Sequence, residues 1–133
     1  MAKFLALLAL LLFNACTYQR AIKQTGVQSI SYGSGGGFTG AVVSYSLSLD
    51  GQLSKTENNS TMPVKVIGTK NVKALFEEAA GLKDYTFNEP GNMYSFITIK
   101  TDTQSRYISW GMGSDRIDSR VTELYGQLMA LTK

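Results

Sequence analysis

The stretch AVVSYSLSLDGQLSKT, residues 41–56, decides how this chain folds. From residue 43 to residue 49, apolar side chains alternate with serines. The apolar positions that share one face are Val43, Tyr45, Leu47 and Leu49. A period of two is typical of a strand with one buried and one solvent-facing side. Asp50-Gly51 is a two-residue hairpin signal, so residues 52–56 are predicted to return as the neighbouring strand.

Helical periodicity follows this hairpin. Residues 70–80 place apolar side chains at positions i, i+3, i+4 and i+7, the stripe of a helix with one buried face. A second helix is predicted from near Asp118 to Leu131. The further predicted strands are residues 27–32, 64–67, 93–101 and 105–110. The order ββ(β)α-ββα predicts an α+β fold, with an antiparallel sheet of about five to six strands and two helices packed on one face.

The two predicted helices share a residue pattern. Val72-x-x-Leu75-Phe76 in the first helix recurs as Val121-x-x-Leu124-Tyr125 in the second. This similarity suggests an internal duplication of a hairpin followed by a helix. The alternative is coincidence, because any two amphipathic helices have the same period.

The first sixteen residues indicate where the protein is placed. Lys3 precedes an unbroken apolar run over residues 4–13, and Ala15 is a small residue before a cleavage position. These features are typical of a secretory signal peptide over residues 1–15. Ten apolar residues span about 15 Å as a helix, about half of a bilayer core, so a permanent membrane span is not predicted.

The run Leu12-Phe13-Asn14-Ala15-Cys16 resembles the lipobox of bacterial lipoproteins. The resemblance implies that the Cys16 thiol is lipidated, that the signal is cut before it, and that acyl chains hold the protein to a membrane. Phe13 and Asn14 depart from the stricter lipobox, although the looser form common in Bacteroidetes tolerates such residues. The alternative is an ordinary signal peptide followed by a free thiol.

Residues 16–26 are predicted to be a lipidated cysteine and a flexible tether, followed by a single domain over residues 27–133. Thr17 stands where some lipoproteins carry the aspartate that retains them in the inner membrane. By resemblance, the expected location is the outer membrane, facing the periplasm.

Composition excludes several kinds of site. The chain has no histidine and one cysteine, which rules out Ser-His-Asp and Cys-His catalysis and zinc or copper sites built from those ligands. A single cysteine also forms no intramolecular disulfide. The net charge of +3 comes without a basic block, so no nucleic-acid partner is expected. We likewise predict no metal and no cofactor.

A glycine-rich segment, residues 33–40, is predicted to be a loop. Residues 35–40 match the pattern G-x-G-x-x-G, but a strand follows them instead of the helix that a dinucleotide site requires, and Ala41 stands where a P-loop has lysine. The loop is therefore either a plain connection or a contact for a partner. In the second interpretation the contact residues are Gly35, Gly36, Gly37, Phe38 and Thr39, with Phe38 as the apolar anchor.

Aromatic residues offer an alternative binding surface. Tyr94 and Phe96 share one face of a predicted strand, opposite Ile97 and Ile99. The candidates for a sugar- or peptide-binding platform are Tyr94, Phe96, Tyr107 and Trp110. The alternative is a central strand with helices on one side and a partly covered second side.

Catalysis is not predicted, and no catalytic residue is assigned. Glu57, Asp84 and Glu89 are loop carboxylates without an obvious structural role, and a hydrolase would need two carboxyls held across a cleft. The chain also loosely resembles small Bacteroidetes envelope lipoproteins of unknown function, through its glycine-rich turn, the Tyr-x-Leu-x-x-Asp-Gly hairpin and the Leu-Phe helix. That resemblance implies a location and a fold, and no activity.

The prediction is a lipid-anchored envelope protein that binds another envelope protein as an accessory subunit, inhibitor or assembly factor. A module that binds a small ligand or a glycan is the second interpretation, and a carboxylate-based hydrolase is the third.

Overall fold

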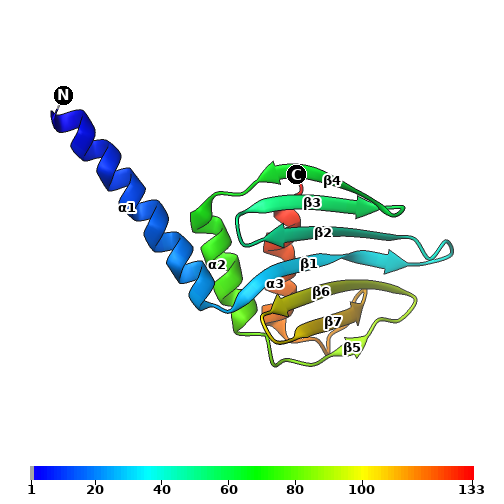
Figure 1. Ribbon diagram of the computed structural model, residues 1–133. Coiled ribbons are helices and arrows are strands. Elements are labelled where there is room, and N and C mark those ends of the chain that lie inside the picture. Colours follow the sequence, from blue (N-terminus) through cyan, green and yellow to red (C-terminus); the bar gives the residue numbers. More distant parts are fainter. Residues whose placement is uncertain (1) are drawn as a thin grey trace.

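The computed structural model describes residues 2–133, and it is an α+β structure built on one mixed sheet (Figure 1). The strands are β1 (Val27–Gly36), β2 (Val42–Ser48), β3 (Gln52–Glu57), β4 (Ser60–Val66), β5 (Asn88–Glu89), β6 (Met93–Thr101) and β7 (Ser105–Gly111). The helices are α1 (Ala2–Gln24), α2 (Thr69–Ala80) and α3 (Ser119–Ala130). Met1 and the side chains of the lipobox residues 12–15 lie outside the described part of the chain.

The sheet has seven strands in the order β4-β3-β2-β1-β6-β7-β5. Its strand pairs are antiparallel except for β5 and β7, which run parallel. The α+β class is therefore confirmed, whereas the expected five to six antiparallel strands become a larger, mixed sheet. The additional strand is β5, two residues that hydrogen-bond to the outer edge of β7 within a predicted loop.

The hairpin predicted from residues 41–56 forms, but three residues, Leu49, Asp50 and Gly51, connect its strands instead of the predicted two. Gly51 has φ of 90°, a left-handed value that glycine adopts without strain. The Asp50 carboxylate accepts a hydrogen bond from the Gln52 amide at 3.2 Å. The register then places Leu47 opposite Leu53, both fully buried.

Helices α2 and α3 cover one face of the sheet. Each turns a stripe of apolar side chains inward, as the helical period predicts: Val72, Leu75, Phe76 and Ala79 from α2, and Val121, Leu124 and Leu128 from α3. The sheet contributes the facing core residues Ile30, Tyr32, Leu47, Leu53, Ile97, Ile99, Ile108 and Trp110. We call this the covered face, and the opposite side of the sheet the open face.

The topology argues against the internal duplication. Strands β2 and β6 both flank β1 and run in the same direction, but β3 lies on one side of this trio and β7 on the other. Since α2 and α3 pack on the same face, the two hairpin-plus-helix segments are opposite in hand (Figure 1). No rotation relates segments of opposite hand, so the shared pattern reflects only the period of two amphipathic helices.

Two predicted loops are shorter than expected. Residues 33–36 belong to β1, because glycines there let neighbouring backbone come very close: a Cβ on Gly33 would collide with the Val43 carbonyl oxygen. The connection between the predicted strands 52–56 and 64–67 is a tight turn at Asn58 and Asn59, whose φ angles are 51° and 61°. Asparagine tolerates this left-handed region, so β4 begins at Ser60.

The predicted flexible tether is helical in the structure. Helix α1 continues through Cys16 to Gln24, and the Ile22 side chain is fully buried in the core. Burial of Ile22 explains the order of this segment, which its polar composition did not suggest. Among the described residues, no helix combines the length and hydropathy that crossing a bilayer requires.

Candidate functional site

The tip of the β1–β2 hairpin presents Phe38 to solvent. Gly36, Gly37 and Gly40 have φ of 91°, 76° and 63°, which turn the chain through conformations that other residues rarely adopt. The Gly37 amide donates to the Asn92 carbonyl oxygen at 2.9 Å, so the base of the tip is held by the chain that leads into β6. The Phe38 side chain is fully exposed.

Two methionines lie at the same end of the sheet. Met93 pairs with Gly36, and the Met112 amide donates to the Met93 carbonyl oxygen at 3.1 Å. Met93 is 53 % exposed and Met112 is 70 % exposed, and Val42 at the start of β2 is also exposed. We call these four residues, Phe38, Val42, Met93 and Met112, the distal apolar end.

Met93 and Met112 were not among the predicted contact residues. A signal for them existed, because Met93 opens one predicted strand and Met112 follows the next. Antiparallel pairing brings the start of one strand beside the end of its neighbour. What the sequence did not supply was the pairing of β1 with β6, which places both methionines beside the Phe38 hairpin.

The other predicted contact residues shape the hairpin. Gly35 lies beneath the Tyr94 ring, and Gly36 packs against the Asn92 carbonyl, so their missing side chains permit close approach within the fold. The Thr39 hydroxyl accepts a hydrogen bond from the Ala41 amide at 3.3 Å. Of the five residues predicted for a partner contact, Phe38 is the large outward side chain.

The aromatic platform forms in part, on the open face. Ring centroids lie 6.3 Å apart between Tyr94 and Phe96, and 5.8 Å apart between Phe96 and Tyr107. Phe96 is nearly buried between its two neighbours, whereas Tyr107 is 45 % exposed. Burial of part of its ring raises the pKa of the Tyr107 hydroxyl.

Trp110 does not belong to this platform, and that part of the prediction is wrong. It lies on the covered face at 6 % exposure and meets Tyr125 of α3 edge-on, with ring centroids 5.2 Å apart. The reason is the strand period: Tyr107 and Trp110 are three residues apart and therefore point to opposite sides of the sheet.

Cys16 lies on α1 and is an exposed, free cysteine. Figure 1 shows α1 leaving the sheet at the end where β1 begins, opposite the β1–β2 hairpin. The predicted anchor and the distal apolar end are thus at opposite ends of the molecule.

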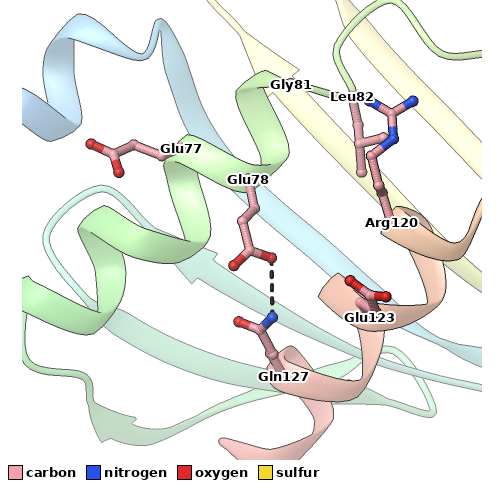
Figure 2. Close-up of a pocket in the computed structure, with 7 residues that line it drawn as sticks. All are labelled: Glu77, Glu78, Gly81, Leu82, Arg120, Glu123 and Gln127. Carbon is pink, nitrogen blue, oxygen red and sulfur yellow. Dashed lines mark hydrogen bonds between the residues drawn. The ribbon is translucent and has the colours of Figure 1, made fainter.

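A shallow hollow of about 310 Å³ lies between α2 and α3 (Figure 2). Its lining residues are Glu77, Glu78, Gly81, Leu82, Arg120, Glu123 and Gln127. Glu78 accepts a hydrogen bond from Gln127 at 3.1 Å and Glu77 pairs with Lys73 at 2.9 Å. These carboxylates therefore have ordinary structural partners on the helix surfaces.

Two of the three unassigned loop carboxylates also have cationic partners. Glu57 pairs with Lys55 at 2.7 Å and Glu89 pairs with Arg116 at 2.9 Å. Within residues 2–133 no group of three or more histidine, cysteine, aspartate or glutamate side chains is placed so that it could hold a metal ion.

No protein-family model matches this chain, and no curated protein sequence matches it significantly. Function is therefore inferred from the geometry of the molecule itself.

Proposed function

We propose that this protein is a lipid-anchored component of the cell envelope and a non-catalytic interaction module. It is held to the outer membrane through Cys16 and faces the periplasm. Its distal apolar end binds another envelope protein, for which it serves as an accessory subunit, inhibitor or assembly factor. The observation that carries this proposal is the full exposure of Phe38, flanked by exposed Met93 and Met112.

The chemistry of the distal apolar end suits a protein contact. Burying a phenylalanine side chain contributes about 1.5–3 kcal/mol, so an exposed Phe38 leaves that free energy available to a complex. Methionines adapt their shape to a partner because they are unbranched and flexible. The glycines around Phe38 let another backbone approach closely.

The placement of the anchor supports the same surface. Strand β1 contains 10 residues and is about 33 Å long. If acyl chains on Cys16 hold the α1 end at the membrane, Phe38 lies at the opposite end of β1, at least the length of this strand from the membrane. The distal apolar end is then accessible to a partner in the periplasm and is kept from inserting into the lipid layer that holds the anchor.

Site-specific photocrosslinking in intact cells tests the contact. A photoreactive phenylalanine derivative at position 38 of the full-length chain should give one discrete crosslinked product. The same group at Thr103, an exposed turn residue at the other end of β6, serves as the matched control. Identical products from both positions, or none from position 38, would place the contact elsewhere.

Metabolic labelling with an alkyne analogue of palmitate tests the anchor separately. Wild-type protein should become labelled and sediment with the outer membrane, and Cys16→Ser should lose both properties. An unlabelled wild-type protein released into the periplasm would instead indicate an ordinary signal peptide followed by a free thiol.

A further inference from the structure

The open face of the sheet carries a second, distinct set of side chains. Residues that pair across antiparallel strands point to the same side, so the strand registers define rows that cross the sheet. The three central rows are Val42–Gly35–Tyr94–Gly111, Thr56–Ser44–Gly33–Phe96–Ser109 and Ser54–Ser46–Ser31–Thr98–Tyr107. No side chain in these rows is charged, and Lys100 lies beyond them.

Small hydroxyl side chains form a low floor on β1, β2 and β3. The Ser31 hydroxyl hydrogen-bonds to the Ser46 hydroxyl at 3.3 Å. Among the residues that the structure describes, no protein group hydrogen-bonds to the hydroxyls of Ser44, Ser54 and Thr98. An exposed sheet face made of serine and glycine is flat, and it offers donors and acceptors that water or a ligand must satisfy.

An aromatic wall stands at the side of this floor. Tyr94 and Tyr107 flank Phe96 on β6 and β7, and the neighbouring β1 residues are glycines. The Tyr94 hydroxyl lies 2.8 Å from the position that a Cβ on Gly35 would occupy, so the ring lies low across the sheet. Tyrosine combines an apolar ring with a polar tip, which suits a ligand that has apolar and hydroxylated surfaces.

A hollow next to β2 and β3, on the side of the sheet away from Tyr94 and Tyr107, adds the side-chain amides of two asparagines. It has a volume of about 390 Å³ and lies between the ends of β2 and β3. Its lining residues are Val42, Ser44, Thr56, Glu57, Asn58 and Asn59. Four strand spacings separate β3 from β7, about 19 Å in total. A ligand that reaches from the hollow to Tyr107 is therefore an extended chain.

We propose that the open face binds a neutral oligosaccharide chain. Sugar rings stack on Tyr107 and Tyr94 through their C–H faces, and sugar hydroxyls hydrogen-bond to Ser44, Thr56 and the Asn58–Asn59 turn. The uncharged rows match an uncharged glycan, whereas a nucleic acid or an acidic peptide would require clustered cations. This surface adjoins the distal apolar end at Val42, but its ligand contacts do not include Phe38, and the proposal does not depend on the proposed function.

Titration calorimetry with defined oligosaccharides tests the proposal. The full-length protein in detergent is titrated with cellohexaose, chitohexaose and maltohexaose, and with sulfated dextran as a charged probe. At least one neutral hexasaccharide should bind. Tyr107→Ala should weaken its binding about tenfold, the loss expected for one stacked ring, and Tyr107→Phe should retain it.

Two further variants separate the open face from the rest of the surface. Ser46→Arg places a long charged side chain on the floor without touching the aromatic wall, and it should abolish binding even if Tyr107→Ala proves unstable. Phe38→Ala removes an exposed aromatic ring elsewhere and should leave binding unchanged. Circular dichroism melts verify that each variant is folded.

Three results would overturn the proposal: no heat from any neutral hexasaccharide, binding of sulfated dextran alone, or equal affinity in wild type and folded Ser46→Arg. None of these results bears on the crosslink at position 38. The two proposals can therefore fail independently.

Discussion

On the covered face of the sheet, the Tyr32 and Tyr45 rings stack with centroids 5.6 Å apart, and Tyr32 has no exposed surface. On the open face, Phe96 and Tyr107 stack at 5.8 Å, and Tyr107 is 45 % exposed. Both faces belong to the same strands and both carry stacked rings. Aromatic clustering alone therefore does not identify a core, because packing by α2 and α3 decides which of the two clusters is excluded from water.

Burial also changes the chemistry of the two clusters. Within the described chain the Tyr32 hydroxyl is buried without a hydrogen-bond partner, and burial raises its pKa well above the ordinary value. On the open face, the pKa of Tyr107 is raised by partial burial, while its ring stays in contact with water. The open face is thus the one on which a tyrosine is available to a ligand.

The largest expected effect comes from removing a ring on each face. Phe76→Ala, in α2 on the covered face, should destabilise the protein by about 3–5 kcal/mol, because it leaves a cavity in a packed core. Phe96→Ala on the open face should cost about 1.5–3 kcal/mol, because the Phe96 ring is buried between two tyrosine rings and outside the core that the helices cover. Urea unfolding followed by Trp110 fluorescence measures both. Equal losses of stability would contradict the difference between the two faces, since they would mean that the open face is covered in solution.

Two hydroxyl deletions on the covered face should have opposite effects on stability. The Tyr125 hydroxyl donates to the Gly33 carbonyl oxygen at 3.2 Å, so Tyr125→Phe should cost about 1 kcal/mol. Tyr32→Phe removes an unpartnered buried hydroxyl and should be neutral or stabilising by up to about 1 kcal/mol. The same unfolding experiment ranks the two variants. A larger loss for Tyr32→Phe would show that its hydroxyl has a partner, such as a buried water.

Phe38 belongs to neither face, and its removal should have a small effect on stability. Phe38→Ala should change the free energy of unfolding by less than about 0.5 kcal/mol, because its fully exposed ring makes little contact within the fold. A thermal melt compared with Phe76→Ala provides the contrast. A drop in Tm approaching that of Phe76→Ala would mean that the hairpin tip folds back onto the domain.

The smallest effect is a pH dependence at the β2–β3 turn. Asp50 accepts hydrogen bonds from the Ser48 hydroxyl and the Gln52 amide, which lower the pKa of its carboxyl below the ordinary value. A lowered folded-state pKa stabilises the fold above the unfolded-state pKa, and this contribution is lost as pH falls through the folded value. When the pH is lowered from neutral to acid, the free energy of unfolding of Asp50→Asn should therefore fall slightly less than that of wild type. Indistinguishable acid unfolding curves would count against this role of the turn.

Local elements were predictable because their signals are local. The strand over residues 93–101 and the apolar stripe of α2 were predicted with the bounds and residues that the structure has. The position of the turn at Asp50-Gly51 was predictable from these two residues, although the connection is one residue longer than predicted because Leu49 belongs to it. In the same way, the alternation of Phe96 with Ile97 correctly predicted that these side chains point to opposite faces.

The errors arose where distant segments meet. Residues 16–26 lacked an apolar pattern, yet the end of α1 is held against the domain, with the Ile22 side chain in the core. Gly33–Gly36 were predicted to be a loop, because glycine composition does not reveal that β2 and β6 lie on both sides of this segment. Trp110 was grouped with Tyr107 although the strand period separates them, and α3 covers only the Trp110 side.

Side-chain type and neighbours along the chain were enough to predict β1 to β4, β6, β7, α2 and α3, and to exclude histidine- and cysteine-based chemistry. The helical continuation of α1, strand β5, the face of the sheet that is covered, and the meeting of Met93 and Met112 with Phe38 at one end all depend on tertiary contacts. A period of two shows that a strand has two sides, but it does not say which side a helix will cover. Which face is covered is determined by packing between residues far apart in the chain, because burial of their apolar surfaces supplies the free energy.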